Sequence, residues 1–270
     1  MNKHNTIGKG LKERAINGGD DKYYTKQKIA DRYSNIILTK YGSNVTYIEP
    51  TAGNGAFLKI LPGIVGYDLK PEGKGIIALD IFDNYNFDDN TVVAGNPPFG
   101  TNANLAIKIF NHIANQNVKS ICFIVPKTFK KVSTQDKLNL NYRLVLEEDI
   151  ESNAFTVEGK NKDVNCVFQI WELSLDKRTM SKHPPTNGVV FTTKDKANIA
   201  IRRAGGKAGQ VLSGLDHSES STYFIKADER IRKMLALIDT SVAGNTAGVK
   251  SISKKELLTE LDIIVQKEKD

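Results

Sequence analysis

The chain has few of the residues that hold structural metals or form disulfides, with two cysteines and four histidines among 270 residues. A structural zinc site needs several cysteine or histidine ligands at close spacing. Cys122 and Cys166 lie far apart, each in an apolar run. We therefore expect two buried thiols in a reducing compartment and no bound metal.

The sequence also lacks any apolar run near the ~18 residues that a membrane-spanning helix needs. Residues 1–20 are polar and rich in glycine and lysine, without the apolar centre of a secretory signal. These absences predict a cytoplasmic protein with no membrane partner, and residues 1–20 are expected to form a flexible basic arm. The length suffices for one main domain and a smaller second one.

Acidic side chains are scarce in some segments of the chain and outnumber basic ones in others, although the net charge of the whole is +7. Residues 45–100 carry three basic and seven acidic side chains, whereas residues 101–143 carry seven basic and one acidic. Residues 1–44 and 176–234 are also basic, by +5 and +6. An acidic segment between basic ones suits a site for a cationic cofactor beside a phosphate-binding surface, or it is an ordinary solvated face.

Helical and strand-like segments alternate along the first 175 residues. Apolar spacing predicts a helix over residues 22–41 with Thr25 as its cap. The further segments expected are strands at 45–48, 64–68, 91–95, 120–125, 144–149 and 164–173, a short element at 75–80, and helices at 56–61 and 104–114. This alternation predicts an α/β sheet with right-handed crossovers. After residue 175, strands at 197–202 and 222–225 and helices at 228–237 and 254–267 predict a small α+β extension.

Polar side chains stand where four of these segments end: Glu49, Asp68, Asp80 and Asn96. In open α/β sheets, ligands bind outside the carboxyl ends of the strands. Each acid alone could be a solvated turn residue, but four such endings within about 50 residues favour a shared site. The sequence therefore predicts that these side chains line one ligand-binding edge.

Asn96-Pro97-Pro98-Phe99 suits chemistry on a planar amino nitrogen, although Asn-Pro is also a common turn dipeptide. The side-chain oxygen of Asn96 and the carbonyl of Pro97 can each accept one N–H bond and so localise the nitrogen lone pair. The prolines fix the backbone, and Phe99 offers a stacking face. No cysteine or histidine adjoins the motif, so we expect direct displacement without a covalent enzyme intermediate.

The segment Gly53-Asn54-Gly55 lies between a strand and a helix, where glycines let the backbone approach a ligand. A dinucleotide site is disfavoured because Leu58 replaces the third glycine of the usual fingerprint, and because Glu49 would repel a pyrophosphate. An acid there instead suits a cofactor that carries an ammonium and a sulfonium group. Asp68 is placed to accept ribose hydroxyls, and Asp80 to accept an adenine amine.

These motifs resemble those of the S-adenosylmethionine-dependent N6-adenine DNA methyltransferases, over roughly residues 20–173. The resemblance implies a Rossmann-like class I methyltransferase sheet in residues 21–175 and a nucleic-acid-binding extension in residues 176–270. Asn96, Pro97, Pro98 and Phe99 would be catalytic. The residues implied to bind S-adenosyl-L-methionine are Tyr24, Thr25, Glu49, Thr51, Gly53, Asn54, Gly55, Asp68, Asp80 and Ile81.

The resemblance further implies that Phe155 stacks on the other face of a flipped base, although Phe155 could equally be a core residue. Lys127, Arg202, Arg203 and Lys207 are suitable substrate contacts, or solvated surface. The extension is shorter than classical target-recognition domains, so a partner subunit is one source of sequence recognition. DNA is the expected substrate. The alternatives are RNA methylation at adenine N6 or guanine N2, protein-glutamine methylation, and a non-catalytic nucleic-acid-binding module.

Overall fold

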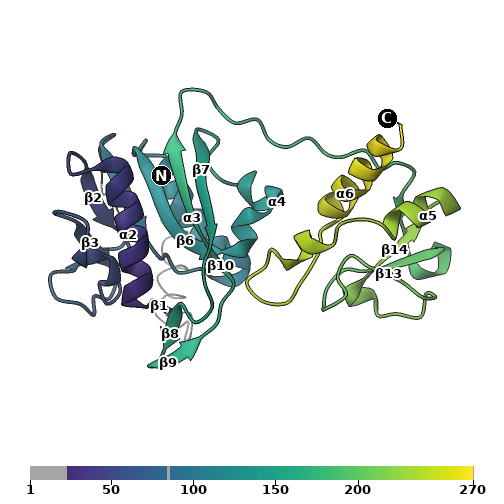
Figure 1. Cartoon of the computed structure of the whole chain (residues 1–270), viewed down its shortest axis with the longest axis horizontal. Coiled ribbons are helices and arrows are strands. Elements are labelled where there is room, and N and C mark those ends of the chain that lie inside the picture. The colour runs from purple at the N-terminus through teal and green to yellow at the C-terminus, as the bar shows by residue number, and fades with distance from the viewer. Residues whose placement is uncertain (1–22, 84–85, 270) are drawn as a thin grey trace, which may run out of the picture. The chain divides into compact units, whose positions relative to one another are not determined.

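The computed structural model describes residues 23–83 and 86–269. The chain divides into two compact units (Figure 1). The first comprises the described residues up to Pro126 and Asp136–Thr179, and the second comprises Lys127–Gln135 and the described residues from Met180 onward. The second unit is therefore built from two separate stretches of the sequence, since residues 127–135 lie within the span predicted for the first domain.

The first unit is built on a seven-stranded sheet in the order β4-β3-β2-β5-β6-β10-β7. Its strands are β2 (Thr46–Glu49), β3 (Val65–Asp68), β4 (Ile77–Ala78), β5 (Thr91–Gly95), β6 (Ser120–Pro126), β7 (Tyr142–Asp149) and β10 (Cys166–Leu173). Five neighbouring strands are parallel, and β10 runs antiparallel to both β6 and β7. A parallel sheet that closes with one reversed strand is the Rossmann-like arrangement of class I methyltransferases, which confirms the predicted fold class.

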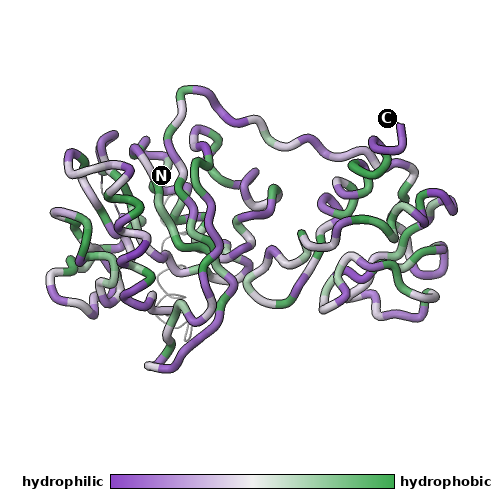
Figure 2. The backbone as a smooth tube through the Cα atoms, in the orientation of Figure 1, coloured by the Kyte–Doolittle hydropathy of each residue, from purple (hydrophilic) through white to green (hydrophobic). Residues whose placement is uncertain are grey.

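Helix α2 (Gln27–Tyr41) precedes the first strand of this sheet, and η1 (Ala56–Lys59), η2 (Thr101–Ala103) and α3 (Asn104–Ala114) lie between its strands. Helix α2 buries Ile29, Tyr33 and Ile37, which recur every four residues and so share one face. The Tyr33 ring stacks on Phe168 of β10 at 4.2 Å between centroids. Figure 2 shows the hydrophobic stretches of the chain concentrated in the interior strands and hydrophilic ones in the loops.

A separate three-stranded sheet in the first unit joins β1 (Tyr24–Thr25), β8 (Phe155–Val157) and β9 (Lys160–Lys162). Thr25 pairs with Phe155 across 130 positions of sequence. The predicted cap at Thr25 is therefore wrong, because Thr25 lies in β1 and helix α2 begins after Lys26, with no side-chain cap. A helix was predicted over residues 56–61, but this segment forms only a 3-10 turn that ends before Pro62.

The second unit contains an antiparallel sheet in the order β11-β14-β12-β13. Its elements are η3 (Lys127–Lys130), α4 (Val132–Gln135), β11 (Val190–Phe191), η4 (Lys194–Lys196), β12 (Ile199–Arg202), β13 (Val211–Leu212), η5 (Glu219–Ser221), β14 (Thr222–Lys226), α5 (Glu229–Leu235), η6 (Ser241–Gly244) and α6 (Lys254–Lys267). Helix α6 begins with a capping box between Ser253 and Glu256. No helix among the described residues is long and apolar enough to cross a membrane.

Lys131 lies inside the second unit and is only 8% exposed. Its ammonium donates to the carbonyl of Ser251 at 2.8 Å and to Glu256 Oε2 at 3.1 Å. Removing one partner of such a buried pair leaves an uncompensated charge, which is strongly destabilising. Lys131 therefore fastens residues 127–135 to the start of α6, and its cation is not available to a phosphate.

Candidate active site

Three neighbouring parallel strands end in polar residues at one edge of the main sheet. Strand β2 ends at Glu49, β3 ends at Asp68, and Asn96 follows β5 directly. Because β2 pairs with both β3 and β5, the three side chains start from adjacent strand ends. Asp80 follows the short strand β4 by two residues. The strand endings predicted from the sequence are thus present, and they converge on one edge.

The loop after β2 is held to the end of β3 by Asp68. Its Oδ2 accepts the Gly53 N–H at 2.8 Å, and its Oδ1 accepts the Lys70 N–H at 2.7 Å. Gly53 and Gly55 have φ angles of 52° and 82°, in the left-handed region that glycine enters at low cost. Each carboxylate oxygen has a second lone pair, so Asp68 can hold the loop and still accept a ligand hydroxyl.

Tyr24 lies over this loop. A side-chain carbon added at Gly53 would lie 3.7 Å from the Tyr24 ring. The Tyr24 hydroxyl donates to Glu72 Oε2 at 2.6 Å. Strand β1 therefore brings the predicted Tyr24 to the predicted Gly53, and Glu72 is a polar partner that sequence reasoning missed. A bond across 48 residues leaves no local pattern by which it could have been found.

Glu49 is the buried acid of the site. It is 3% exposed, and its Oε2 has no hydrogen-bond partner. Burial, and then the nearby charge of Asp68, raises the pKa of Glu49 well above its ordinary value. A carbon added at Gly95 would lie 3.3 Å from Glu49 Oε1, so only glycine lets β5 pass this close. An unpaired buried carboxyl is costly, and a cationic ligand would satisfy it.

Two buried hydroxyls near these loops are also without hydrogen-bond partners. They belong to Thr25 of β1 and to Thr51, two residues after Glu49. Asn54 lies between the two glycines, in the same loop. Buried polar atoms are normally satisfied, so the unpaired hydroxyl of Thr51, two residues from the unpaired carboxyl of Glu49, indicates a place for a polar ligand.

Asn96 is fixed by a contact to the start of the described chain. Its side-chain N–H donates to the backbone carbonyl of Tyr23 at 3.0 Å. A carbonyl accepts and cannot donate, so this bond fixes which end of the amide faces Tyr23. The other end, Oδ1, is buried and has no partner. The acceptor atom required by the predicted chemistry is therefore unused and oriented.

Phe99 is 6% exposed, and its ring stacks on the Tyr23 ring at 5.9 Å between centroids and 18° between planes. Pro97 is buried, and Pro98 is half-buried. Phe155 is 0% exposed and belongs to the hydrophobic core, with its ring edge-on to Tyr23 at 6.4 Å. Of the two roles considered for Phe155, packing in the core matches this burial, since the ring presents no face on which a base could stack.

Asp80 and Ile81 lie together after β4. Asp80 Oδ1 accepts the Phe82 N–H at 3.1 Å, and Ile81 is 5% exposed. The Phe82 ring meets the ring of His112 on α3 edge-on at 5.2 Å. Burial lowers the pKa of His112. A short acidic turn with an apolar neighbour is suited to a purine ring.

Two of the side chains predicted to contact phosphate in the second unit already donate hydrogen bonds within that unit. Arg202 donates to the Ser221 hydroxyl at 2.8 Å, and Arg203 donates to the Ser220 carbonyl. Lys207 is exposed beside the glycine-rich loop. Lys127, in η3, is half-buried.

No group of three or more potential metal ligands occurs among the residues that the structure describes.

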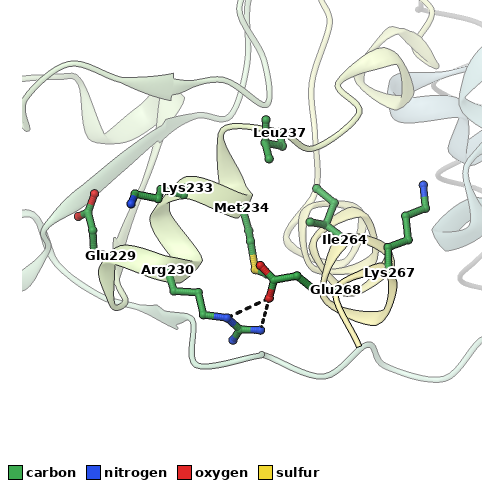
Figure 3. Close-up of a pocket in the computed structure, with 8 residues that line it drawn as sticks. All are labelled: Glu229, Arg230, Lys233, Met234, Leu237, Ile264, Lys267 and Glu268. Atoms are coloured by element: carbon green, nitrogen blue, oxygen red, sulfur yellow. Dashed lines mark hydrogen bonds and ion pairs between the residues drawn. The ribbon is translucent and has the colours of Figure 1, made fainter. Parts of the chain in front are cut away.

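A groove of about 490 Å³ lies between α5 and α6 of the second unit. Figure 3 shows Met234 and Ile264 among the side chains that line it, and an ion pair between Arg230 and Glu268 at 2.6 Å. None of the residues predicted to bind cofactor or substrate lines this groove. The groove is therefore separate from the residues that the motifs single out.

Comparisons with known proteins return similarities of fold. No protein-family model matches the sequence, and no curated protein does. One similar solved structure, from Vibrio vulnificus YJ016, is assigned as a modification subunit of a type I restriction enzyme; it has 15% identity and a TM-score of 0.43. That match covers 62% of this chain and 48% of the other, so this chain spans about half of that protein.

Two further similar structures are named as methyltransferases. A tRNA methyltransferase of M. jannaschii has 14% identity and a TM-score of 0.39, with 57% of this chain and 52% of the other covered. Magnesium protoporphyrin IX methyltransferase from Synechocystis PCC 6803, with bound SAM, has 9% identity and a TM-score of 0.38, with coverages of 55% and 79%. The three proteins are named for different roles, and the likeness is one of fold.

Proposed function

We propose that this chain transfers a methyl group from S-adenosyl-L-methionine to the N6 amino group of adenine in DNA. The observation that carries the proposal is the buried, unpaired Oδ1 of Asn96, whose amide is oriented by its bond to the Tyr23 carbonyl. An acceptor held ready without a partner suits a substrate N–H group. The Asn-Pro-Pro-Phe motif and its position after the cofactor loop support adenine as the target.

The residues at the strand ends fit the proposed cofactor. The unpaired carboxyl of Glu49 suits its cationic end, and Asp68 suits the ribose hydroxyls. Asp80 and Ile81 suit the adenine ring. Thr51, Asn54 and the two glycines of the loop after β2, with Tyr24 and Thr25 of β1, are assigned to the rest of the cofactor. When bound, S-adenosyl-L-methionine supplies an electrophilic methyl group on a sulfonium, which is a good leaving group.

The chain's own part in the reaction is to position and polarise the acceptor. Asn96 Oδ1 and the Pro97 carbonyl accept the two N–H groups of the target amine and localise its lone pair. Phe99 offers the face on which the base stacks. Adenine in a duplex is out of reach, so the base is flipped or the substrate is single-stranded. Positioning and electrostatics together supply the rate enhancement, and a strong general base is not required.

Basic segments support nucleic acid as the partner. The second unit presents Lys207 and the exposed part of Arg203 beside its glycine-rich loop. Phosphate contacts of this kind position a nucleic acid without reading its sequence. We therefore assign DNA holding to the second unit and to residues 1–20, which lie outside the described residues, and we assign target recognition to short contacts or to a partner subunit.

The deciding experiment incubates the protein with isotope-labelled S-adenosyl-L-methionine and unmethylated DNA, total RNA or a protein pool. Digested products are then analysed by mass spectrometry. We expect N6-methyladenine in DNA with the wild-type chain and at least about 10²-fold less with Asn96→Ala. Asn44→Ala, at an exposed asparagine before β2, is the matched control and should act as wild type. Methylated RNA alone, methylated guanine, or label in protein would refute the proposal.

A further inference from the structure

Three aromatic rings meet beside Asn96, but only one of them is accessible to a substrate. Phe99 is 6% exposed and Phe155 is 0% exposed, whereas Tyr23 is half-buried. The Tyr23 ring lies nearly parallel to Phe99 and edge-on to Phe155. Tyr23 therefore stands between the proposed stacking face and the solvent, with Phe155 supporting its edge.

Tyr23 is joined to the proposed catalytic residue in two ways. Its backbone carbonyl accepts the N–H of Asn96, and its ring covers Phe99 three residues further along the motif. The next two residues, Tyr24 and Thr25, form β1 and pair with β8. The backbone of Tyr23 is thus anchored by its own carbonyl and by the strand that follows it.

The two rings are spaced for direct contact and are too close for a base between them. A flat base between two rings needs about 7 Å from one ring to the other, which is two van der Waals layers of about 3.5 Å. The Phe99 and Tyr23 centroids are 5.9 Å apart. Near-parallel rings in contact are offset, with their faces about 3.5 Å apart, so the Tyr23 ring must move by about a further 3.5 Å to admit a base. A side-chain rotation of that size leaves the bond from its carbonyl to Asn96 in place.

We propose that Tyr23 is the second wall of the acceptor pocket: its ring covers Phe99 when no base is present, and it moves aside so that the target base stacks between Phe99 and Tyr23. This inference rests on the proposed function and gives to Tyr23 the stacking role that was predicted for Phe155. In the free protein, the Tyr23 ring shields Phe99 from water. The sandwich holds the amino group beside Asn96 Oδ1, which faces away from the Tyr23 carbonyl.

The kinetic test compares Tyr23→Leu, Tyr23→Phe and Phe155→Leu with the wild-type chain on the same unmethylated DNA. Losing a stacking face should raise the KM for DNA by about 5- to 150-fold in Tyr23→Leu, with kcat changed far less. Tyr23→Phe should stay close to wild type, since it keeps the ring. Phe155→Leu should lower the melting temperature because it leaves a core cavity, and it should leave the KM within a few-fold of wild type.

A spectroscopic test uses Tyr23→Trp, because the chain's one native tryptophan, Trp171, is 1% exposed in the core. Fluorescence of the introduced indole should be quenched when single-stranded DNA is added together with S-adenosylhomocysteine, and not by S-adenosylhomocysteine alone. An unchanged KM in Tyr23→Leu, or an indole that does not respond to DNA, would overturn the sandwich. If the wild-type chain methylates no nucleic acid, the proposed function itself fails, and this inference falls with it.

Discussion

The two units use their polar groups in opposite ways. At the strand ends of the first unit, acceptors are buried and unpaired, including Glu49 Oε2 and Asn96 Oδ1. In the second unit, Arg202, Arg203 and Lys131 all donate to groups of their own unit. A buried acceptor without a partner costs free energy of folding, and a partner offsets at least part of that cost.

The difference separates two kinds of binding. Unpaired buried acceptors prepare a site for one ligand in one orientation, because each atom requires a donor at a fixed place. Arg202 and Arg203, which donate to serines of their own unit, keep only part of their surface for a phosphate, which suits contacts that position a nucleic acid without reading its sequence. We therefore expect substitutions in the first unit to change chemistry and cofactor affinity, and those in the second to change salt dependence.

Substitutions of Asn96 should have the largest effect on methyl transfer. Asn96→Ala removes the unpaired acceptor, and the single-turnover rate should fall about 10²-fold or more. Asn96→Asp keeps an oxygen that accepts the N–H and should keep partial activity. Affinity for S-adenosyl-L-methionine, measured by calorimetry, should be nearly unchanged in both, since the proposed contact of Asn96 is to the methyl acceptor and not to the cofactor. Near-wild-type methyl transfer by Asn96→Ala would reduce the motif to a turn.

Asp68 tests the cofactor side. Asp68→Ala removes the proposed ribose acceptor and the hydrogen bonds from the Gly53 and Lys70 N–H groups, so cofactor affinity should fall by about 1.5–3 kcal/mol, or roughly 10- to 150-fold. Asp89→Ala, at an exposed aspartate, should bind as wild type. Equal affinity of Asp68→Ala and Asp89→Ala in calorimetry would remove Asp68 from the site.

Glu49 links stability to pH in a definite direction. Because its pKa is raised in the folded state, its stabilising contribution is complete at low pH and is lost as pH rises through that pKa. Glu49→Gln without cofactor should therefore melt higher than wild type at pH 8, and the difference should vanish below the ordinary pKa of 4.5. The same variant should bind S-adenosyl-L-methionine more weakly.

Thermal melts at several pH values, with and without cofactor, check the Glu49 prediction. The exposed Glu219→Gln is the control and should show no such pH dependence. A Glu49→Gln melting temperature equal to that of wild type at every pH would mean that the buried carboxyl is satisfied in the folded state. Tighter cofactor binding by Glu49→Gln would contradict the assigned cationic partner.

The smallest expected effect is in the second unit. Replacing Arg202, Arg203 and Lys207 together by alanine should make the plot of log K against log salt concentration for DNA binding less steep. The decrease should equal the contribution of about one to three phosphate contacts. Cofactor affinity should be unaffected. The control replaces three exposed lysines of the first unit, Lys108, Lys119 and Lys137, and so removes the same charge. Equal slopes for the two triple variants would place the footprint elsewhere.

Local patterns predicted the parts of the fold that depend on neighbours in sequence. Strand β5 and helices α3 and α6 have the predicted bounds, because each has a continuous apolar run or a regular apolar face. The strand ends at Glu49 and Asp68 followed for the same reason. Two-residue strands such as β1 have no period to detect, so the pairing of Thr25 with Phe155 could not be read from the sequence.

The missing parts of the site have the same origin. Asn96 was predicted from its own motif, but its orientation comes from a carbonyl 73 residues earlier. Phe155 carried an aromatic signature, yet only packing shows that it is buried and that Tyr23 holds the accessible ring. Residue type thus singled out the candidate groups, and long-range contacts determine which of their atoms are available.

The ion pair between Lys131 and Glu256 has a consequence for biosynthesis. The two residues are 125 positions apart, so at about 5–20 residues per second the ribosome makes Glu256 roughly 6–25 s after Lys131. During that interval residues 127–135 have no α6 to pack against, and the Lys131 ammonium stays in water. The second unit can be completed only when α6 emerges, which makes the order of synthesis part of the order of folding.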